Sequence, residues 1–267
     1  MHHLVQYITV RTNVGSIPND KYAEKGLNML KAVLCDLDGT LLPMDQDAFT
    51  NLYFNLMAET MEPHGYDRES LIKTIWKGTG AMVQNDGLLT NEEVFWKYFT
   101  AQYPQRDIEA DKPLFNAFYS TVFQKAIQAC SPCAEANALI KSLKKHNIRV
   151  VLATNPLFPS VATFTRIGWA GLDRNDFEYV STYENSHFCK PNSCYYDEIL
   201  KKLSLKAEEC VMVGNDAEED TAASVLGVKC FLLTDCLINK HNCDIQQYPH
   251  GGFDTLNAYL MDLITEA

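Results

Sequence analysis

The stretch Lys31–Leu42, which reads KAVLCDLDGTLL, places two carboxylates two residues apart at the end of a short apolar run. The run Ala32–Cys35 is typical of a strand that is buried on both faces. Burial of one carboxylate is costly, and two neighbouring carboxylates also repel each other. We therefore expect Asp36 and Asp38 to lie at a site that offsets their charge and uses both acids.

Composition and charge narrow the kinds of protein that the chain can be. With 267 residues, of which 46% are hydrophobic and 21% charged, it is large enough for one large domain or two modest ones. Its 23 basic and 34 acidic residues give a net charge of −11. This charge argues against a nucleic acid or an anionic membrane as partner, because both favour a basic face. A small anionic substrate remains possible, since a site can be locally positive.

Location and cysteine usage point to the cytoplasm. No apolar run approaches the length of about 18 residues that a membrane span needs, and no signal-peptide pattern is present. The nine cysteines are an odd number without the spacing of a disulfide framework, which indicates reduced thiols. Cys130 and Cys133 form a CxxC without a second ligand pair, so we interpret them as two thiols where the chain enters a helix. Residues 1–28 show no sustained period, and we assign this N-terminal extension no function.

Apolar runs recur along the rest of the chain and alternate with helical patterns. Strands that alternate with helices predict an α/β fold, with a parallel sheet whose crossovers are right-handed. Such sheets bind ligands at the carboxyl ends of their strands, near the switch in strand order. The expected strands are Ala32–Cys35, Arg149–Ala153, Phe177–Val180, Cys210–Val213 and Lys229–Leu233, and the helices between them are Ala134–Lys145, Ser160–Ile167, Tyr195–Leu203 and Glu218–Leu226.

The interval between Leu42 and Cys130 shows only helical patterns. Its roughly ninety residues are too many for a crossover loop, so we expect residues 45–129 to form a second, all-helical domain. The α/β core would then comprise residues 29–44 and 130–267. The expected helices are Phe49–Thr60, capped by Asp47 or Thr50, Arg68–Lys77, Asn91–Gln102, capped by Thr90 with Glu93, and Pro113–Ala129, with the aromatic cluster Phe95–Phe99 packed among them.

Polar side chains suited to phosphate or Mg²⁺ follow four of the expected strands. Each has a plain structural interpretation, because acids and threonines cap or begin helices and turns and lysines are commonly solvated. Parallel strands end at the same edge of a sheet, however, and four such groups in order favour one shared site. The groups are Asp36–Thr40 after the first strand, Thr154 and Asn155 after the second, Lys190 after the third, and Asn215, Asp216 and Asp220 after the fourth.

These four motifs resemble those of the haloacid dehalogenase-like superfamily of phosphohydrolases. The matching segments are DLDGT at 36–40, the apolar strand that ends in Thr154, Lys190 before Pro191, and GNDAEED at 214–220. They occur in the order of the family and extend over about residues 31–233. The resemblance implies a Rossmann-like core with an inserted helical cap of the C1 type between the first and second motifs.

The resemblance also implies a role for each residue, and the chemistry of the side chains agrees. Asp36 would be the nucleophile that forms an aspartyl-phosphate, and Asp38 the general acid that later acts as base. Thr154 and Asn155 would contact the phosphate, and Lys190 would bind both the nucleophile and a phosphate oxygen. Mg²⁺ would be held by Asp36, by the backbone carbonyl of Asp38 and by an acid after the fourth strand.

The fourth motif departs from the commonest pattern of the family, in which an aspartate follows the glycine directly. Here Asn215 stands at that place, and the acid comes one residue later. We predict that Asp216 is the metal ligand. Asp220 would act from behind it, by fixing Lys190 or a metal-bound water.

The stretch Trp76–Gly87 is rich in glycine and lies between two expected helices. One interpretation is a loop that faces the site and brings Lys77 to the substrate. The other is a plain helix break. Four histidines have no partner at catalytic or metal-binding spacing, and we interpret them as solvated or structural; they are His64, His146, His187 and His241.

The function that these features favour is an Mg²⁺-dependent phosphatase that hydrolyses a small phosphorylated metabolite through an aspartyl-phosphate. A sugar-phosphate mutase would use the same two aspartates and return the phosphoryl group to its substrate. A carbon–halogen hydrolase needs neither the metal nor an acid at position 38, so Asp38 and the acidic fourth motif weigh against it. A non-catalytic binding or regulatory protein on the same fold would find support only in Asn215. The sequence makes no prediction of the oligomeric state.

Overall fold

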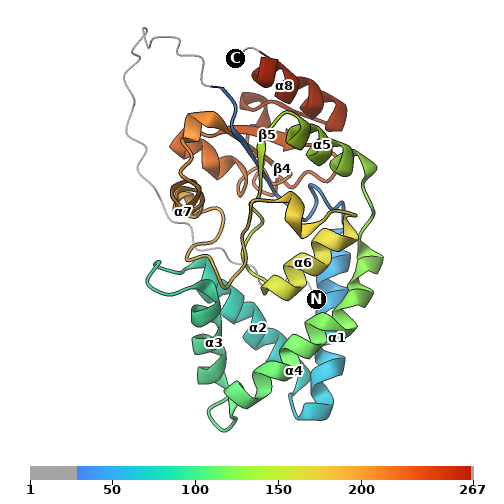
Figure 1. Cartoon of the computed structure of the whole chain (residues 1–267). Coiled ribbons are helices and arrows are strands. Elements are labelled where there is room, and N and C mark those ends of the chain that lie inside the picture. Colours follow the sequence, from blue (N-terminus) through green and yellow to red (C-terminus); the bar gives the residue numbers. More distant parts are fainter. Residues whose placement is uncertain (1–28, 266–267) are drawn as a thin grey trace.

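The computed structural model describes residues 29–265, so the N-terminal extension 1–28 lies outside the described residues. A six-stranded parallel sheet forms the core, in the order β3-β2-β1-β4-β5-β6 (Figure 1). This parallel sheet confirms the α/β prediction. The strands are β1 (Ala32–Cys35), β2 (Arg149–Leu152), β3 (Tyr179–Val180), β4 (Cys210–Gly214), β5 (Lys229–Leu233) and β6 (His250–Gly251).

The strand order reverses on either side of β1. The chain proceeds from β1 to β2 and β3 in one direction and from β4 to β6 in the other. Val33 pairs with Val150 of β2 and with Val211 of β4, so β1 is hydrogen-bonded along both edges. The switch point, where ligands bind in open parallel sheets, therefore lies at the carboxyl end of β1, where Asp36 follows directly.

Helices cover both faces of the sheet and explain the continuous apolar run in β1. All four of its side chains are fully buried. Val33 and Cys35 belong to a hydrophobic cluster with α5 and α8, and Ala32 and Leu34 to a second cluster with α7. Figure 1 shows α5 and α8 on one side of the sheet and α7 on the other. The core helices are α5 (Ala134–Lys145), α6 (Ser160–Trp169), α7 (Ser193–Leu203) and α8 (Phe253–Thr265).

Between β1 and α5 the chain is helical, as expected, and we call residues 45–129 the helical insert. Asp45 caps its first helix by accepting the Ala48 N–H at 2.9 Å, so the prediction of Asp47 or Thr50 as cap was wrong. Thr90 and Glu93 form the predicted capping box. The elements are α1 (Gln46–Met61), η1 (Glu62–His64), α2 (Arg68–Val83), α3 (Asn91–Gln102), α4 (Ile108–Ser120) and η2 (Val122–Ala129).

The insert joins the core through two adjacent segments. The Asp45 N–H donates to Ala129 O at 3.3 Å, and the Ser131 N–H donates to Pro43 O at 2.9 Å. These bonds place residues 43–45 beside residues 129–131, where we propose the limits of the insert. Just beyond, the Cys133 thiol accepts the Ala136 N–H and caps α5, which agrees with a structural interpretation of the CxxC.

The start of α3 is a further contact between insert and core. Asn91 is fully buried, and its N–H donates to Ser186 O at 2.9 Å. Its side-chain amide lies 3.3 Å from Phe188 O and 3.4 Å from Pro156 O. The insert is thus tied to the segment that precedes Lys190 and to the one that follows Asn155.

Both interpretations of Trp76–Gly87 were wrong in part, because α2 continues to Val83. Gly78 lies inside this helix and faces α3, and a Cβ there would come within 2.9 Å of the Phe95 ring. The glycine therefore serves close helix packing rather than a loop. The expected helix Pro113–Ala129 is replaced by α4 and η2, and Glu218–Leu226 contains only a 3₁₀ helix at Thr221–Leu226.

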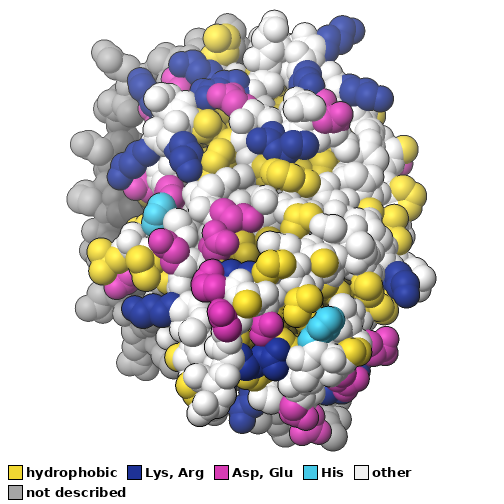
Figure 2. All heavy atoms as spheres, turned by 60° about the horizontal axis from the view of Figure 1, so that its bottom comes forward, with side chains coloured by type: hydrophobic (Ala, Val, Ile, Leu, Met, Phe, Trp, Pro, Cys, Tyr) yellow, Lys and Arg dark blue, Asp and Glu magenta, His cyan; other side chains and the backbone are white. Residues whose placement is uncertain are grey.

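All nine cysteines are free. Within residues 29–265 no helix has the length and apolar character to cross a membrane. Acidic, basic and apolar side chains are interspersed over the face shown in Figure 2, where the basic ones are scattered rather than gathered into one field.

The two glycines of α2 provide a matched test of this packing. Gly80→Ala should raise the free energy of unfolding by about 1 kcal/mol, because alanine favours a helix and no atom lies within 4 Å of the added Cβ. Gly78→Ala should bring no such gain, since Phe95 would have to move. Urea unfolding of both variants measures the difference, and equal stabilisation would contradict the close contact between α2 and α3.

Candidate active site

Asp36 begins the loop after β1 and is held from both backbone and side chain. Its N–H donates to Val213 O at 2.9 Å, and its Oδ1 accepts the Lys190 ammonium at 2.9 Å. Burial raises the pKa of Asp36 to about 7; Lys190 opposes this shift, and the carboxylates of Asp220 and Asp38 add to it. The carboxylate is thus fixed beside a cation at the switch point of the sheet.

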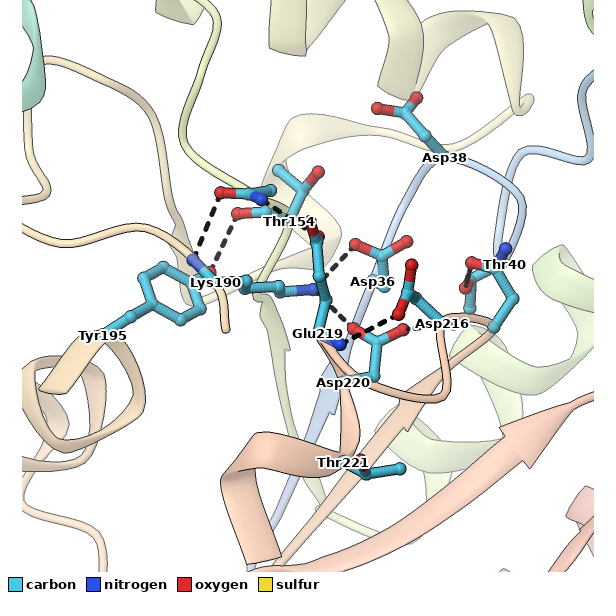
Figure 3. A network of polar contacts seen from close by, with 12 residues as sticks. Asp36, Asp38, Thr40, Thr154, Lys190, Tyr195, Asp216, Glu219, Asp220 and Thr221 are labelled. Atoms are coloured by element: carbon cyan, nitrogen blue, oxygen red, sulfur yellow. Dashed lines mark hydrogen bonds and ion pairs between the residues drawn. The ribbon is translucent and has the colours of Figure 1, made fainter. Parts of the chain in front are cut away.

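Lys190 joins the loops that follow β1 and β4. Its side chain is 1% exposed and donates to Asp36 Oδ1 at 2.9 Å and to Asp220 Oδ1 at 2.6 Å (Figure 3). Burial alone would lower the pKa of Lys190, but Asp220 and Asp36 raise it well above its ordinary value. The lysine is therefore a permanent cation, and Asp220 fixes it as the sequence predicted.

The loop after β4 is shaped by Asp216 and Asp220. Asp216 Oδ1 accepts the N–H groups of Glu218 and Glu219 at 2.8 and 2.9 Å, and Asp220 Oδ2 accepts the Asp216 N–H at 2.9 Å. These turn bonds replace the first turn of the expected helix. Gly214 has no room for a side chain, since a Cβ would lie 2.0 Å from Asp220 Oδ2.

Asn215 faces Gly39 and Thr40 at the end of the first motif, and not Asp36 at its beginning. Its Oδ1 accepts the Thr40 hydroxyl at 2.8 Å, and its Nδ2 donates to Cys236 O at 2.7 Å. The amide packs against Gly39, whose φ of +85° and lack of space exclude a Cβ. Asn215 is 2% exposed, and its side chain holds the DLDGT loop in place through its contacts with Thr40 and Gly39.

Thr154 and Asn155 complete the site from the end of β2. The Thr154 carbonyl accepts the Tyr195 hydroxyl at 2.8 Å and the Ser181 hydroxyl at 2.7 Å, which fixes the backbone of a nearly fully buried residue. Asn155 Oδ1 accepts the Lys190 N–H at 3.3 Å. Figure 3 shows Asp36, Thr154, Lys190 and Asp216 gathered around one centre.

Glu219 is a site residue that the sequence did not single out. Its Oε2 accepts the Asn155 amide at 2.9 Å, and burial raises its pKa to about 8, with Lys190 acting in the opposite direction. The only sequence signal was its position between two acids already assigned to the site. It adds a further carboxyl group near a single ammonium.

Asp38 lies apart from this cluster. Figure 3 shows its carboxylate turned away from Asp36. It forms an ion pair with Arg166 of α6, and its other oxygen, Oδ1, is buried without a hydrogen-bond partner. Arg166 was missed in the sequence, where its one weak signal is that of a single arginine within the apolar helix SVATFTRIGW.

Lys77 is not brought to the site. It lies in the middle of α2 with an exposed side chain, and no hydrogen bond or ion pair joins it to the described residues of the cluster. The prediction depended on a loop at this position, and the loop is absent because the helix continues. Two of the four histidines pair with acids, His187 with Glu198 at 2.7 Å and His241 with Glu218 of the loop after β4.

The balance of charge at the centre fits a divalent cation. Four carboxyl groups surround one ammonium, and burial raises the pKa of Asp216 as well as those of Asp36 and Glu219. Within residues 29–265 no three side chains of His, Cys, Asp or Glu form a ready metal cluster, but the predicted set needs only two carboxylates and one carbonyl. Oxygen donors of this kind are the ones that Mg²⁺ prefers.

A surface hollow of about 520 Å³ lies elsewhere and is not the predicted site. It is lined by Pro43, Cys133, Asp235 and Phe253 among others, and by none of the motif residues.

A buried carboxylate held by a lysine lies at the switch point of the parallel sheet, which is where α/β proteins of this class bind their ligands. The haloacid dehalogenase-like hydrolase family model matches residues 30–227, and the chain belongs to this family of hydrolases. This membership confirms both the resemblance and the hydrolase class that the sequence predicted.

Two relatives agree with this assignment in sequence, and a solved structure shares the fold. The phosphoglycolate phosphatase of Colwellia psychrerythraea is 27% identical over 240 residues, which cover 87% of this chain and 96% of the relative. That of Photorhabdus laumondii is 27% identical over 215 residues, which cover 79% and 83%. The crystal structure of a 2-haloacid dehalogenase from Pseudomonas syringae covers 88% of this chain and 99% of its own, with a TM-score of 0.57 and 17% identity. The last similarity concerns the fold alone.

The raised pKa of Asp36 predicts a pH-dependent stability in metal-free protein. Folding raises the pKa from its ordinary value of 3.8 to about 7, so the folded state binds this proton more tightly. The resulting stability is present at pH 4 and is lost as the pH rises through about 7. Urea unfolding in a chelator between pH 5 and 8 should show this fall, and Asp36→Asn should show a smaller one. Equal slopes for the two proteins would contradict the shift.

Proposed function

We propose that the protein is an Mg²⁺-dependent phosphatase that hydrolyses a small phosphorylated metabolite through an aspartyl-phosphate on Asp36. Family membership and the names of the relatives support a phosphoric monoester hydrolase. The observation that carries the mechanism is the position of Asp36, bound to Lys190 at the switch point with a second acid two residues away. The nine free cysteines support a reducing compartment such as the cytoplasm.

Asp36 would attack phosphorus, and the bond from phosphorus to the ester oxygen would break as the new bond forms. Lys190 would favour the ionised form of Asp36, orient its carboxylate and offset charge on a phosphoryl oxygen. The hydroxyl of Thr154 would donate to a second oxygen. Asn155 would hold Lys190 and Glu219 in register, since it bonds to both.

Asp36, Asp216 and the carbonyl of Asp38 are the groups that would hold Mg²⁺. When bound, the ion would orient the phosphate and shield its charge from the attacking carboxylate. Asn215 is a poor candidate for this role, because its amide is committed to Thr40 and Cys236. Asp216 retains one oxygen that accepts no backbone N–H.

Asp38 would protonate the leaving alcohol and then activate the water that cleaves the aspartyl-phosphate. In the structure its carboxylate is bound by Arg166, so it must turn toward Asp36 before it can serve as the acid. A mutase would use the same pair. No contact in the described residues favours that alternative, and a mutase would return the phosphoryl group rather than release phosphate.

Asp36→Asn should abolish the release of phosphate from para-nitrophenyl phosphate, because only the nucleophile is lost, and Mg²⁺ should be needed for the wild-type rate. Phosphate trapping should label Asp36 in the wild type. Asp47→Asn, an exposed aspartate of α1, is the matched control and should be active. Labelling at another residue would overturn the mechanism, and transfer without release of phosphate would indicate a mutase.

The metal assignment is tested by the Mg²⁺ concentration that gives half of the maximal rate. Asp216→Ala should raise this concentration most. Asp220→Ala should raise it by about 10- to 100-fold, since Asp220 does not bind the ion itself but holds Lys190 and the backbone of Asp216. Asn215→Ala should cost stability through Thr40 but raise the Mg²⁺ requirement least. The rise in melting temperature on addition of Mg²⁺ gives a readout independent of turnover. If Asn215→Ala shows the largest shift, Asp216 is not the ligand.

A further inference from the structure

Arg166 is a buried cation with one strong partner. Its side chain is 1% exposed, and the guanidinium lies 4.4 Å above the Phe158 ring. Its remaining hydrogen bonds, to Ala162 O and to the Thr163 hydroxyl, are both 3.4 Å long. The ion pair with Asp38 therefore provides nearly all of the charge compensation that burial of an arginine requires.

The proposed reaction removes this partner. Asp38 must turn toward Asp36 to reach the leaving oxygen, and it cannot at the same time remain paired with Arg166. A buried guanidinium without its carboxylate is strongly unfavourable. Either Asp38 stays paired with Arg166 and cannot act as the acid, or another anion replaces Asp38 beside Arg166.

Arg166 lies beside aromatic rings and hydroxyl groups from both core and insert. The insert brings the hydroxyls of Tyr53 and Tyr119 near it, and they lie 2.9 Å from each other. The ring of Tyr53 packs against Phe158 at 5.4 Å between centroids. Burial raises the pKa of Tyr53 to about 12, and the positive charge of Arg166 acts in the opposite direction. An anion of the size of the Asp38 carboxylate would fit where that carboxylate now lies.

We infer that Arg166 is the specificity-determining residue, which releases Asp38 in exchange for a carboxylate carried by the substrate close to its phosphoryl ester. This inference rests on the proposed phosphatase function and deepens it. The substrate class is a small phosphorylated carboxylic acid, because a guanidinium binds a carboxylate through a planar fork. A bound substrate carboxylate then frees the acid at the moment it is needed. Phosphate esters without a carboxylate leave Asp38 paired with Arg166.

The exchange is tested by affinity in a protein that cannot turn over. Asp36→Asn should bind 2-phosphoglycolate about 10- to 100-fold more tightly than its uncharged amide, phosphoglycolamide, in calorimetry with Mg²⁺ present. Adding Arg166→Met should remove most of this preference. Adding Arg149→Met is the matched control. This arginine also pairs with a carboxylate, that of Glu178, but it is the first residue of β2 and so lies at the amino ends of the strands, opposite the site. It should leave the preference intact.

Three outcomes would overturn the inference. The first is equal affinity of Asp36→Asn for the two ligands, an outcome that is measured without any substitution of Arg166. The second is a preference that persists in a folded Arg166→Met double variant. If that variant does not fold, Arg166→Lys takes its place and should weaken the preference, because an ammonium lacks the planar fork of a guanidinium. An unchanged preference in the Arg166→Lys variant is the third outcome. Labelling of Asp36 by para-nitrophenyl phosphate in the wild type needs no acid for the leaving group, so it separates these results from a failure of the phosphatase function.

Discussion

The site depends on one buried ammonium. Lys190 lies between Asp36 and Asp220 at 2.9 and 2.6 Å, and each carboxylate belongs to a different strand end. A lysine and two carboxylates buried separately would each be strongly destabilising, whereas together they compensate one another. The same contact draws the loops after β1 and β4 toward the segment before α7. Three strand ends are thereby held in one arrangement, and an excess of negative charge remains for a metal ion.

Close backbone packing around this ion pair explains the small residues of the motifs. Gly39 leaves space for the Asn215 amide, and Gly214 leaves space for the Asp220 carboxylate. Because Gly39 has no Cβ, the loop after β1 can approach the loop after β4 closely, and because Gly214 has none, the loop after β4 can fold back on itself. β1 beneath them is buried on both faces, so its carboxyl end is a rigid support for Asp36.

The helical insert acts on the site through the second aspartate. Asp38 points toward α6 and Arg166, and the insert closes this region with the hydroxyls of Tyr53 and Tyr119. Asn91 also ties the insert to Pro156, which follows Asn155, and to Phe188, which precedes Lys190. Asp36 is therefore held by the core, whereas Asp38 lies where core and insert meet. Two carboxylates two residues apart thus have different surroundings, which lets them perform different tasks.

The sequence by itself determined five of the six strands, their alternation with helices, the helical character of the insert and the four polar strand ends, because each is visible in a local pattern of burial or charge. It did not predict β6 or α8. Only the tertiary structure decided which side chains meet. It paired Asp38 with an arginine 128 residues away, placed Glu219 on Asn155, and turned Asn215 toward Thr40. It also made Gly78 a packing residue inside α2 and left Lys77 in the middle of that helix. These outcomes depend on contacts between elements that are distant in the chain, and no local spacing encodes them.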